Sequence, residues 1–305
     1  MGAGHDHGAG SSSRRLLLAF IITATVLVAG VVGAVLTGSL ALLVDAGHML
    51  TDAGGLLIAL TAARLMQRPP NERRTWGYAR AEVLGAGAQA TVLLAVGGYA
   101  LVEGVRRLLA DDPAHVAGGL LLVFGVVGLV GNLVSMLVLA GGREDNLNLR
   151  AAFLEVVADA LGSVAVIVSA VLIQTLGWVK ADAVAGLLIA LLILPRAVVI
   201  LREAGSVLLE SVPPGLSLAE VREHLLGVGH VLDVHDLHVS RIGTGTPVLT
   251  AHVVVEDECF HDGHAPQLLD ALQTCVASHF DVSVEHSTFQ LEMRRHTDHE
   301  HAHHP

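Results

Sequence analysis

The sequence predicts an α-helical membrane protein whose membrane-spanning part is followed by a small α+β domain. Mean hydropathy is +0.62, and only 15% of the residues are charged. Soluble domains carry about 25% charged residues, so this balance indicates a chain for which the bilayer is the solvent. Six long apolar runs cover the first two thirds of the chain, and after residues 213–214 the hydrophobic period changes to that of helices alternating with strands.

Each apolar run is long enough for a helix to cross the hydrocarbon core, which takes about 20 residues. The first run follows Arg14 and Arg15 and lacks a small-residue cleavage site, so we interpret it as a retained helix rather than a signal peptide. Together the runs define a transmembrane domain at 16–203. The predicted spans are Leu16–Leu36, Leu40–Leu65, Ala81–Leu109, Ala117–Ala140, Leu149–Thr175 and Ala181–Leu201.

Basic residues in the short connections predict the orientation, because cytoplasmic loops are enriched in arginine and lysine. An even number of spans puts both termini on one side. The opposite side holds only Arg106, Arg107 and Lys180. The sequence therefore predicts a multi-pass protein of the plasma (inner) membrane with both termini in the cytoplasm. The basic residues on the side of the termini are Arg14, Arg15, Arg64, Arg68, Arg73, Arg74, Arg80, Arg143, Arg150 and Arg202.

The C-terminal domain is predicted at 211–293, with the element order αββαβ. We expect both helices on one face of an antiparallel sheet. A domain of about 80 residues is close to the lower limit for a self-sufficient core, so a partner copy is expected. The His-rich tail 294–305 is predicted to be disordered. The predicted elements are helix Leu218–Val228, strands Val231–Ile242 and Val248–Glu256, helix Pro266–Phe280 and strand Val282–Met293.

Ionisable side chains inside membrane spans are costly and are functional by default. His48 and Asp52 share one face of the second span, and Glu155 and Asp159 share one face of the fifth. One imidazole with several carboxylates is a ligand set for Zn²⁺ or a similar ion. Asp45 lies on the same face of the second span as His48 and Asp52, nearer the outer end of the span, and suits a residue at the entrance to the ion site. Two alternatives stay open: helices locked by hydrogen bonds, and a relay that carries only protons.

Several motifs in order resemble the cation diffusion facilitator family. They are His48-Met-Leu-Thr-Asp52, Trp76-Gly-Tyr-Ala-Arg-Ala-Glu82, Asn132, Glu155-Val-Val-Ala-Asp159 and Val234-His-Asp-Leu-His-Val239. The resemblance runs from about residue 15 to residue 293. It implies a homodimeric antiporter that moves divalent transition-metal ions, Zn²⁺ first, out of the cytoplasm in exchange for protons by alternating access. The same resemblance implies that the C-terminal domain is cytoplasmic and ferredoxin-like.

Carried over by position, the transport site comprises His48, Asp52, Glu155 and Asp159, and protons are exchanged at His48, Asp52 and Asp159. Most zinc transporters of this family have His or Asp where this chain has Glu155. A carboxylate in place of imidazole hardens the site, which broadens the expected selectivity toward Co²⁺ or Mn²⁺. An exporter that prefers Co²⁺, Mn²⁺ or Cd²⁺ is an alternative. Metal ions, protons and lipid are the expected partners, and no organic cofactor is expected.

The C-terminal domain carries further histidines that suit a regulatory metal site. His235, His252 and His286 lie on three different predicted strands, and His264 lies nearby. His238 is expected on the opposite strand face from His235. The alternative is a set of ordinary surface histidines. Residues 1–15 are predicted to form a His-containing cytoplasmic segment. Its His5 and His7 and the tail histidines suit weak metal capture or are incidental, and Cys259 and Cys275 are expected to be packed.

Other function classes fit the sequence less well. An intramembrane metalloenzyme needs an arrangement such as His-Glu-x-x-His, and no span contains one, so an enzyme is not expected. A channel favours weak sites, whereas a deep His/carboxylate site holds its ion tightly. The net charge of −11 argues against nucleic acid. A membrane metal sensor that does not transport remains a further alternative.

Overall fold

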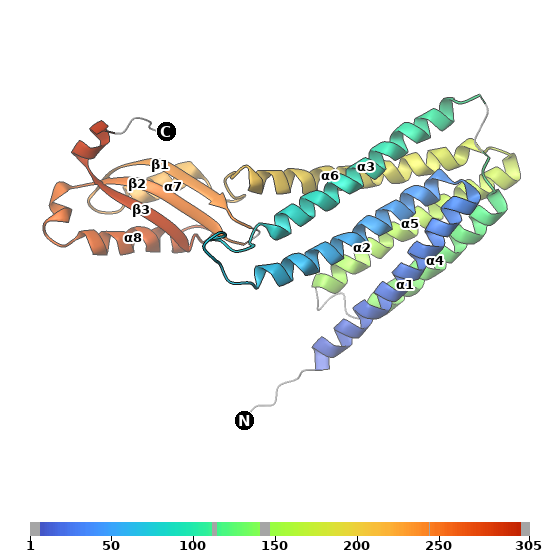
Figure 1. The fold of residues 1–305 in the computed structure, drawn as a ribbon, viewed down its shortest axis with the longest axis horizontal. Coiled ribbons are helices and arrows are strands. Elements are labelled where there is room, and N and C mark those ends of the chain that lie inside the picture. The colour runs from blue at the N-terminus through green and yellow to red at the C-terminus, as the bar shows by residue number, and fades with distance from the viewer. Residues whose placement is uncertain (1–6, 112–114, 141–146, 244, 300–305) are drawn as a thin grey trace. The chain divides into compact units, whose positions relative to one another are not determined.

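The computed structural model describes residues 7–111, 115–140, 147–243 and 245–299 (Figure 1). The chain divides into two compact units, one of residues 1–57 and 88–201 and the other of residues 58–87 and 202–305. The long helices are α1 (His7–Thr37), α2 (Leu40–Met66), α3 (Ala81–Leu109), α4 (Gly118–Ala140), α5 (Leu147–Leu176) and α6 (Lys180–Leu208).

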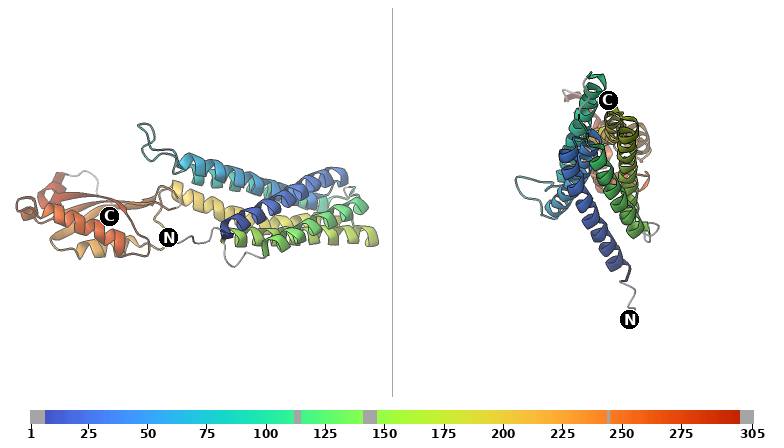
Figure 2. Two further views of the ribbon diagram at one scale, coloured as in Figure 1. Left: turned by 90° about the horizontal axis from the view of Figure 1, so that it is seen from below. Right: turned by 90° about the vertical axis from the view of Figure 1, so that its right-hand side faces the viewer.

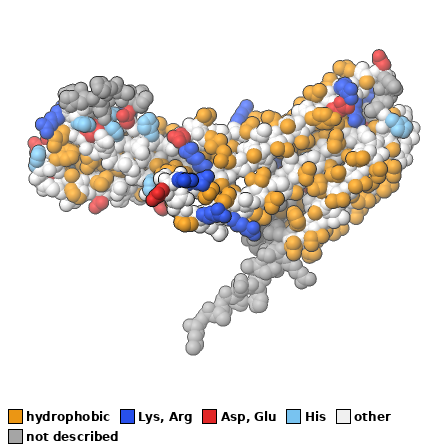
Figure 3. Space-filling model, viewed as in Figure 1, with side chains coloured by type: hydrophobic (Ala, Val, Ile, Leu, Met, Phe, Trp, Pro, Cys, Tyr) orange, Lys and Arg blue, Asp and Glu red, His pale blue; other side chains and the backbone are white. Residues whose placement is uncertain are grey.

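Within the described ranges, six helices are long and apolar enough to cross a membrane, which confirms the predicted number of spans. Figure 3 shows hydrophobic side chains covering most of the visible surface of these helices, with charged side chains concentrated toward their ends. Helix α6 continues to Leu208 instead of ending at Leu201. Arg202 and Glu203 are polar but favour helices, so they end the apolar stretch without ending the helix.

Small residues let the helices approach closely. Helix α1 lies along α4 and α5 (Figure 2). On α3, a Cβ atom added at Gly104 would lie 2.6 Å from Leu187 Cγ of α6, and one added at Gly97 would lie 2.7 Å from a methyl of Leu194. Because lipid supplies no hydrophobic force between helices, such close backbone packing is a main source of their association.

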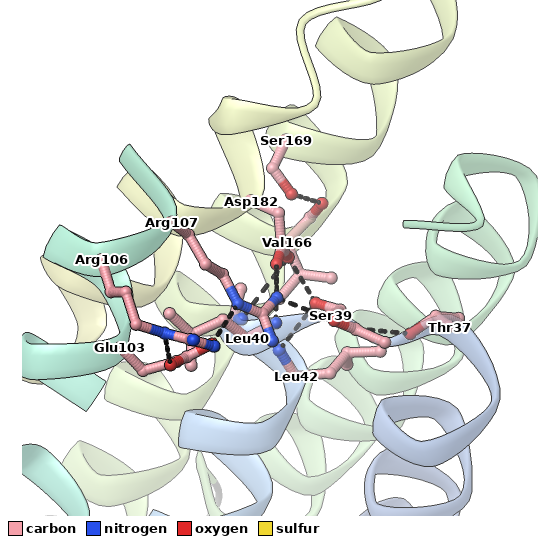
Figure 4. Close-up of polar contacts among 12 residues, drawn as sticks. Thr37, Ser39, Leu40, Leu42, Glu103, Arg106, Arg107, Val166, Ser169 and Asp182 are labelled. Carbon is pink, nitrogen blue, oxygen red and sulfur yellow. Dashed lines mark hydrogen bonds and ion pairs between the residues drawn. The ribbon is translucent and has the colours of Figure 1, made fainter. Parts of the chain in front are cut away.

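A buried carboxylate anchors the start of α2 (Figure 4). Asp182 of α6 accepts hydrogen bonds from the hydroxyl of Ser39 and, at 2.6 Å, from the backbone N–H of Leu40. The first N–H groups of a helix have no partner within that helix, and a carboxylate at this end also complements the helix dipole. Arg107 of α3 pairs with two carboxylates: its Nη1 lies 3.7 Å from Asp182 Oδ2, and its Nε lies 2.9 Å from Glu103 Oε1. This network joins α2, α3 and α6 and fixes the helix that carries His48 and Asp52.

The C-terminal domain has the predicted order αββαβ. Its elements are α7 (Leu218–Leu226), β1 (Val231–Arg241), β2 (Pro247–Val255), the 3₁₀ helix η1 (Asp257–Phe260), α8 (Ala265–Ser278) and β3 (His286–Met293). The sheet order is β1-β2-β3. Alternate strand residues such as Leu249 and Val253 pack with Val221 of α7 and Leu272 of α8 in one core. The other face of the sheet carries polar side chains.

The expectation of an antiparallel sheet is wrong for one of its two strand pairs. β1 and β2 are antiparallel, but β2 and β3 are parallel. The reason is the intervening helix α8, which returns the chain to the end where β2 began, as a crossover between parallel strands does. β3 also begins at His286 rather than Val282. Residues Arg294–His299, where the sequence predicts disorder, form the 3₁₀ helix η2, and 300–305 lie outside the described residues.

Candidate metal sites

The structure brings together His48 and Asp52 of α2 and Asp159 of α5. His48 Nδ1 lies 3.3 Å from Asp52 Oδ2, and His48 Nε2 lies 3.9 Å from Asp159 Oδ1. The imidazole therefore lies between the two carboxylates. Only 7% of His48 and 4% of Asp159 is exposed. The helical spacing of four residues sets the first pair, and the packing of α5 beside α2 supplies the third side chain.

Several polar atoms around this cluster are unsatisfied. Among the described residues, His48 Nδ1, Asp159 Oδ1 and Asn132 Oδ1 are buried and have no hydrogen-bond partner. Asp45 is also buried, and it faces α5 where a Cβ atom on Gly162 would lie 2.8 Å from its Oδ1. Buried polar groups are nearly always paired, so a cluster of unpaired ones is a place where a cation or protons fit.

Glu155 also reaches this cluster, through a side-chain hydrogen bond with Asp52, and it has a second, basic partner. Its Oε1 accepts a hydrogen bond from Arg196 Nη1 of α6 at 3.0 Å, and about a third of its side chain is exposed. The sequence interpretation did not consider Arg196, although a single arginine between Leu191 and Ile200 was the signal that could have revealed it. The cluster therefore has its own protein cation, paired with the carboxylate that departs from the family pattern.

A second cluster lies on the polar face of the C-terminal sheet. His252 Nδ1 is 2.8 Å from Glu292 Oε1, and His235 Nε2 is 3.4 Å from Glu292 Oε2. The two imidazole rings meet edge to face with centroids 5.2 Å apart. One ligand atom from each of the three side chains lies within 4.8 Å of the others. This geometry suits three ligands of a tetrahedral ion, with one position left for a fourth.

Two other predicted ligands lie elsewhere in the domain. His286 begins β3 and packs against Trp76, with ring centroids 4.7 Å apart. His264 precedes α8, where its Nδ1 lies 2.7 Å from Asp262 Oδ2. Glu292 takes part instead, and the sequence interpretation missed it. Its signal was the alternation of Thr288, Gln290 and Glu292 with apolar residues along the last strand, which puts Glu292 on the polar face.

The expectation that His238 lies on the opposite face from His235 is wrong. The β1–β2 register shifts between the pairs His235–His252 and His238–Thr250, so three residues of β1 match two of β2. This is a β-bulge, and Asp236 within it has a positive φ of 46°. The extra residue reverses the alternation, and His238 borders the same shallow pocket as His252. Strict period-two counting cannot reveal such a bulge.

The remaining predicted residues lie at the chain ends. His5 and the histidines at 301, 303 and 304 lie outside the described residues, as does the first part of the segment 1–15. Cys259 and Cys275 are both buried, as expected for packed cysteines.

Comparison with protein families accounts for nearly the whole chain. Residues 16–209 match the family described as cation efflux transmembrane domain. Residues 213–294 match the family described as cation efflux protein, cytoplasmic domain. The boundary between the two matches falls where the sequence changes its hydrophobic period.

Curated relatives are similar to this chain over most of their length. The chain is 41% identical over 294 residues to the metal cation efflux system protein CzcD of Cupriavidus metallidurans, covering 96% of this chain and 91% of that protein. It is 40% identical over 284 residues to the zinc transporter ZitB of Escherichia coli, covering 92% and 88%. The cadmium, cobalt and zinc/H(+)-K(+) antiporter of Bacillus subtilis is 35% identical over 257 residues, covering 84% and 82%.

Proposed function

The chain belongs to the cation diffusion facilitator family, and we propose that it exports divalent transition-metal ions, Zn²⁺ first, in exchange for protons. The observation that carries the proposal is the cluster of His48, Asp52 and Asp159, in which His48 Nδ1 and Asp159 Oδ1 are buried without a hydrogen-bond partner. An imidazole and two carboxylates from two helices offer mixed nitrogen and oxygen ligands of the kind that zinc accepts. The relatives named as zinc and cadmium, cobalt and zinc transporters support this choice of cargo.

Metal and protons compete for the same atoms of this cluster. Zn²⁺ requires a neutral imidazole and ionised carboxylates, so binding the ion releases protons and protonation releases the ion. A site that faces the cytoplasm loads metal, and the same site facing a more acidic exterior takes up protons and releases metal. His48 suits the exchange because an imidazole changes charge between pH 5 and 8.

Glu155 and Arg196 tune the cluster. The guanidinium neutralises the extra carboxylate, so the charge available to the cargo is set by Asp52 and Asp159. When Arg196 moves away, Glu155 becomes a fourth, harder ligand, which favours Co²⁺ or Mn²⁺ over softer ions. The pair therefore sets ion preference, and Asp45 lies along the route by which ions reach the cluster.

The orientation and assembly follow the same proposal. The excess of arginine on the side of the termini puts them in the cytoplasm of a plasma (inner) membrane protein. The small C-terminal domain pairs with a second copy and makes the transporter a homodimer, which supplements a core that is marginal for its size. There the His235, His252 and Glu292 cluster binds Zn²⁺ as a regulatory ligand.

The test is metal flux into proteoliposomes that contain a trapped metal-sensitive dye. We expect Zn²⁺ to move fastest among Zn²⁺, Co²⁺, Cd²⁺ and Mn²⁺, and Asp159→Ala to lose the flux of all four. Glu155→His should shift the preference further toward Zn²⁺. If no metal moves through the wild type while Zn²⁺ still binds, the chain is a sensor rather than a transporter. Equal flux through Asp159→Ala contradicts the proposed site.

A further inference from the structure

A third group of side chains of metal-ligating type lies in the C-terminal domain where β1 begins and β2 ends, away from the sheet-face cluster. His230 lies between α7 and β1, Glu256 follows β2, and Cys259 lies in η1. Ligand atoms of these three side chains lie within 4.8 Å of one another. His230 Nδ1 is 2.6 Å from Glu256 Oε2. Neither the transport proposal nor the sheet-face cluster uses them.

The backbone holds the three residues in fixed relation. The N–H of Glu256 donates to the carbonyl of His230 at 3.1 Å, and the N–H of Cys259 donates to the carbonyl of Glu256 at 3.0 Å. His230 also has a positive φ of 70°, a conformation that is strained for a residue with a side chain. Main-chain hydrogen bonds therefore fix the backbone positions from which the three ligand side chains extend.

The surroundings favour a cation and not a reactive thiol. The carboxylates of Asp262, Glu256 and Glu258 lie near the Cys259 thiol and make its surroundings negative. A reactive cysteine needs the opposite setting, with positive charge that stabilises the thiolate. A bound divalent ion supplies that charge and deprotonates a coordinating thiol outright.

We propose that His230, Glu256 and Cys259 form a metal site that takes a soft divalent ion such as Cd²⁺ or Zn²⁺. In a tetrahedral site the ligand atoms are about 3.3–3.7 Å apart, which is farther than the 2.6 Å between His230 Nδ1 and Glu256 Oε2. The two side chains therefore separate slightly, and the ion replaces the proton that they share. The His264 ring stacks on His230 with centroids 5.7 Å apart, which places a further imidazole beside the site. The thiolate makes this site softer than the other two clusters, which contain only nitrogen and oxygen.

Sulfur gives the site a spectroscopic signature that the other clusters cannot produce. The full-length protein, reduced and purified in detergent, is titrated with Cd²⁺ and with Co²⁺ while thiolate-to-metal charge-transfer absorption is recorded. The chain has only two cysteines, so the band has two possible origins. We expect a band that saturates at the intensity of one thiolate ligand per chain, disappears in Cys259→Ser and persists in Cys275→Ser, the matched control.

Two surface variants keep the test decisive if Cys259→Ser does not fold. His230→Ala and Glu256→Gln retain the thiol and should weaken the apparent affinity at least about tenfold, the lower end of the effect of losing an outer-shell partner. Absence of a band in the wild type would overturn the proposal. So would a band that survives Cys259→Ser, or one that neither surface variant weakens.

Discussion

The chain presents the same ligand chemistry on two different scaffolds. In the membrane, His48 and Asp52 occupy one helix face and meet Asp159 of a neighbouring helix. In the C-terminal domain, His235 and His252 meet Glu292 across three strands. The helical cluster follows from spacing within each helix, whereas the sheet cluster depends on strand register and a bulge. Ligands that share a helix are visible in a sequence, whereas across the strands the sequence identifies His235 and His252 and only the fold shows that Glu292 joins them.

The two clusters should also differ in what their loss does, and the largest effect is expected in the membrane. Asp159→Asn keeps the size of the side chain but removes a charged ligand, so metal flux should fall about 100-fold or more, beyond the loss of an outer-shell partner. Flux is measured in proteoliposomes. Ser135→Ala is the control, because its buried hydroxyl has no hydrogen-bond partner among the described residues. Equal loss in both variants would show that any change to the helix core impairs transport.

The sheet cluster should affect stability more than flux. Zn²⁺ at about 100 times its dissociation constant should add about 2.7 kcal/mol to the stability of the domain that binds it. His235→Ala should abolish this zinc-dependent shift in thermal unfolding of the full chain and leave substantial flux. His238→Ala is the matched control, since His238 shares the face but not the cluster. If His235→Ala stopped transport as completely as Asp159→Asn, the predicted difference between the two clusters would be wrong.

A change to the Glu155–Arg196 pair in the membrane should have a smaller effect, and it should strengthen metal binding instead of weakening it. Arg196→Gln removes a positive charge from the neighbourhood of the cargo site, so divalent ions should bind about 1–2 kcal/mol more tightly, roughly tenfold. Competition binding against a metal-sensitive dye measures this change. Arg202→Gln, in the same helix outside the predicted span, is the control. A weaker affinity in Arg196→Gln would mean that the arginine positions the ligands instead of opposing the ion.

The bulge predicts the smallest effect. Asp236 has a positive φ, which glycine adopts freely and a β-branched residue does not. Asp236→Val should therefore lower the free energy of unfolding by about 1–2 kcal/mol and weaken zinc binding at the sheet cluster. Asp236→Gly should keep both within about 0.5 kcal/mol. Denaturant unfolding with and without Zn²⁺ measures the two variants. Equal effects would mean that the Asp236 side chain, not its backbone, maintains the bulge.

The difference between the helical cluster and the sheet cluster explains which parts of the fold and of the sites could be predicted from the sequence. The spans were predictable because lipid requires long apolar runs, and His48, Asp52 and Asp159 stood out because ionisable residues are rare in them. The order αββαβ followed from hydrophobic periodicity. The parallel pairing of β2 and β3 was not predictable at that level, because it depends on where α8 returns the chain. Arg196 and Glu292 were overlooked because their partners are far away in the sequence.

In the proposed mechanism, metal ions and protons exchange at one intramembrane cluster, that of His48, Asp52 and Asp159. The most direct test is simultaneous recording of a zinc dye and a pH dye in proteoliposomes under an imposed pH gradient. We predict Zn²⁺ movement coupled to opposite proton movement, with both lost together in Asp159→Asn. Zn²⁺ flux that is unaffected by the gradient and accompanied by no proton movement would contradict this mechanism, as would proton movement that persists in the variant.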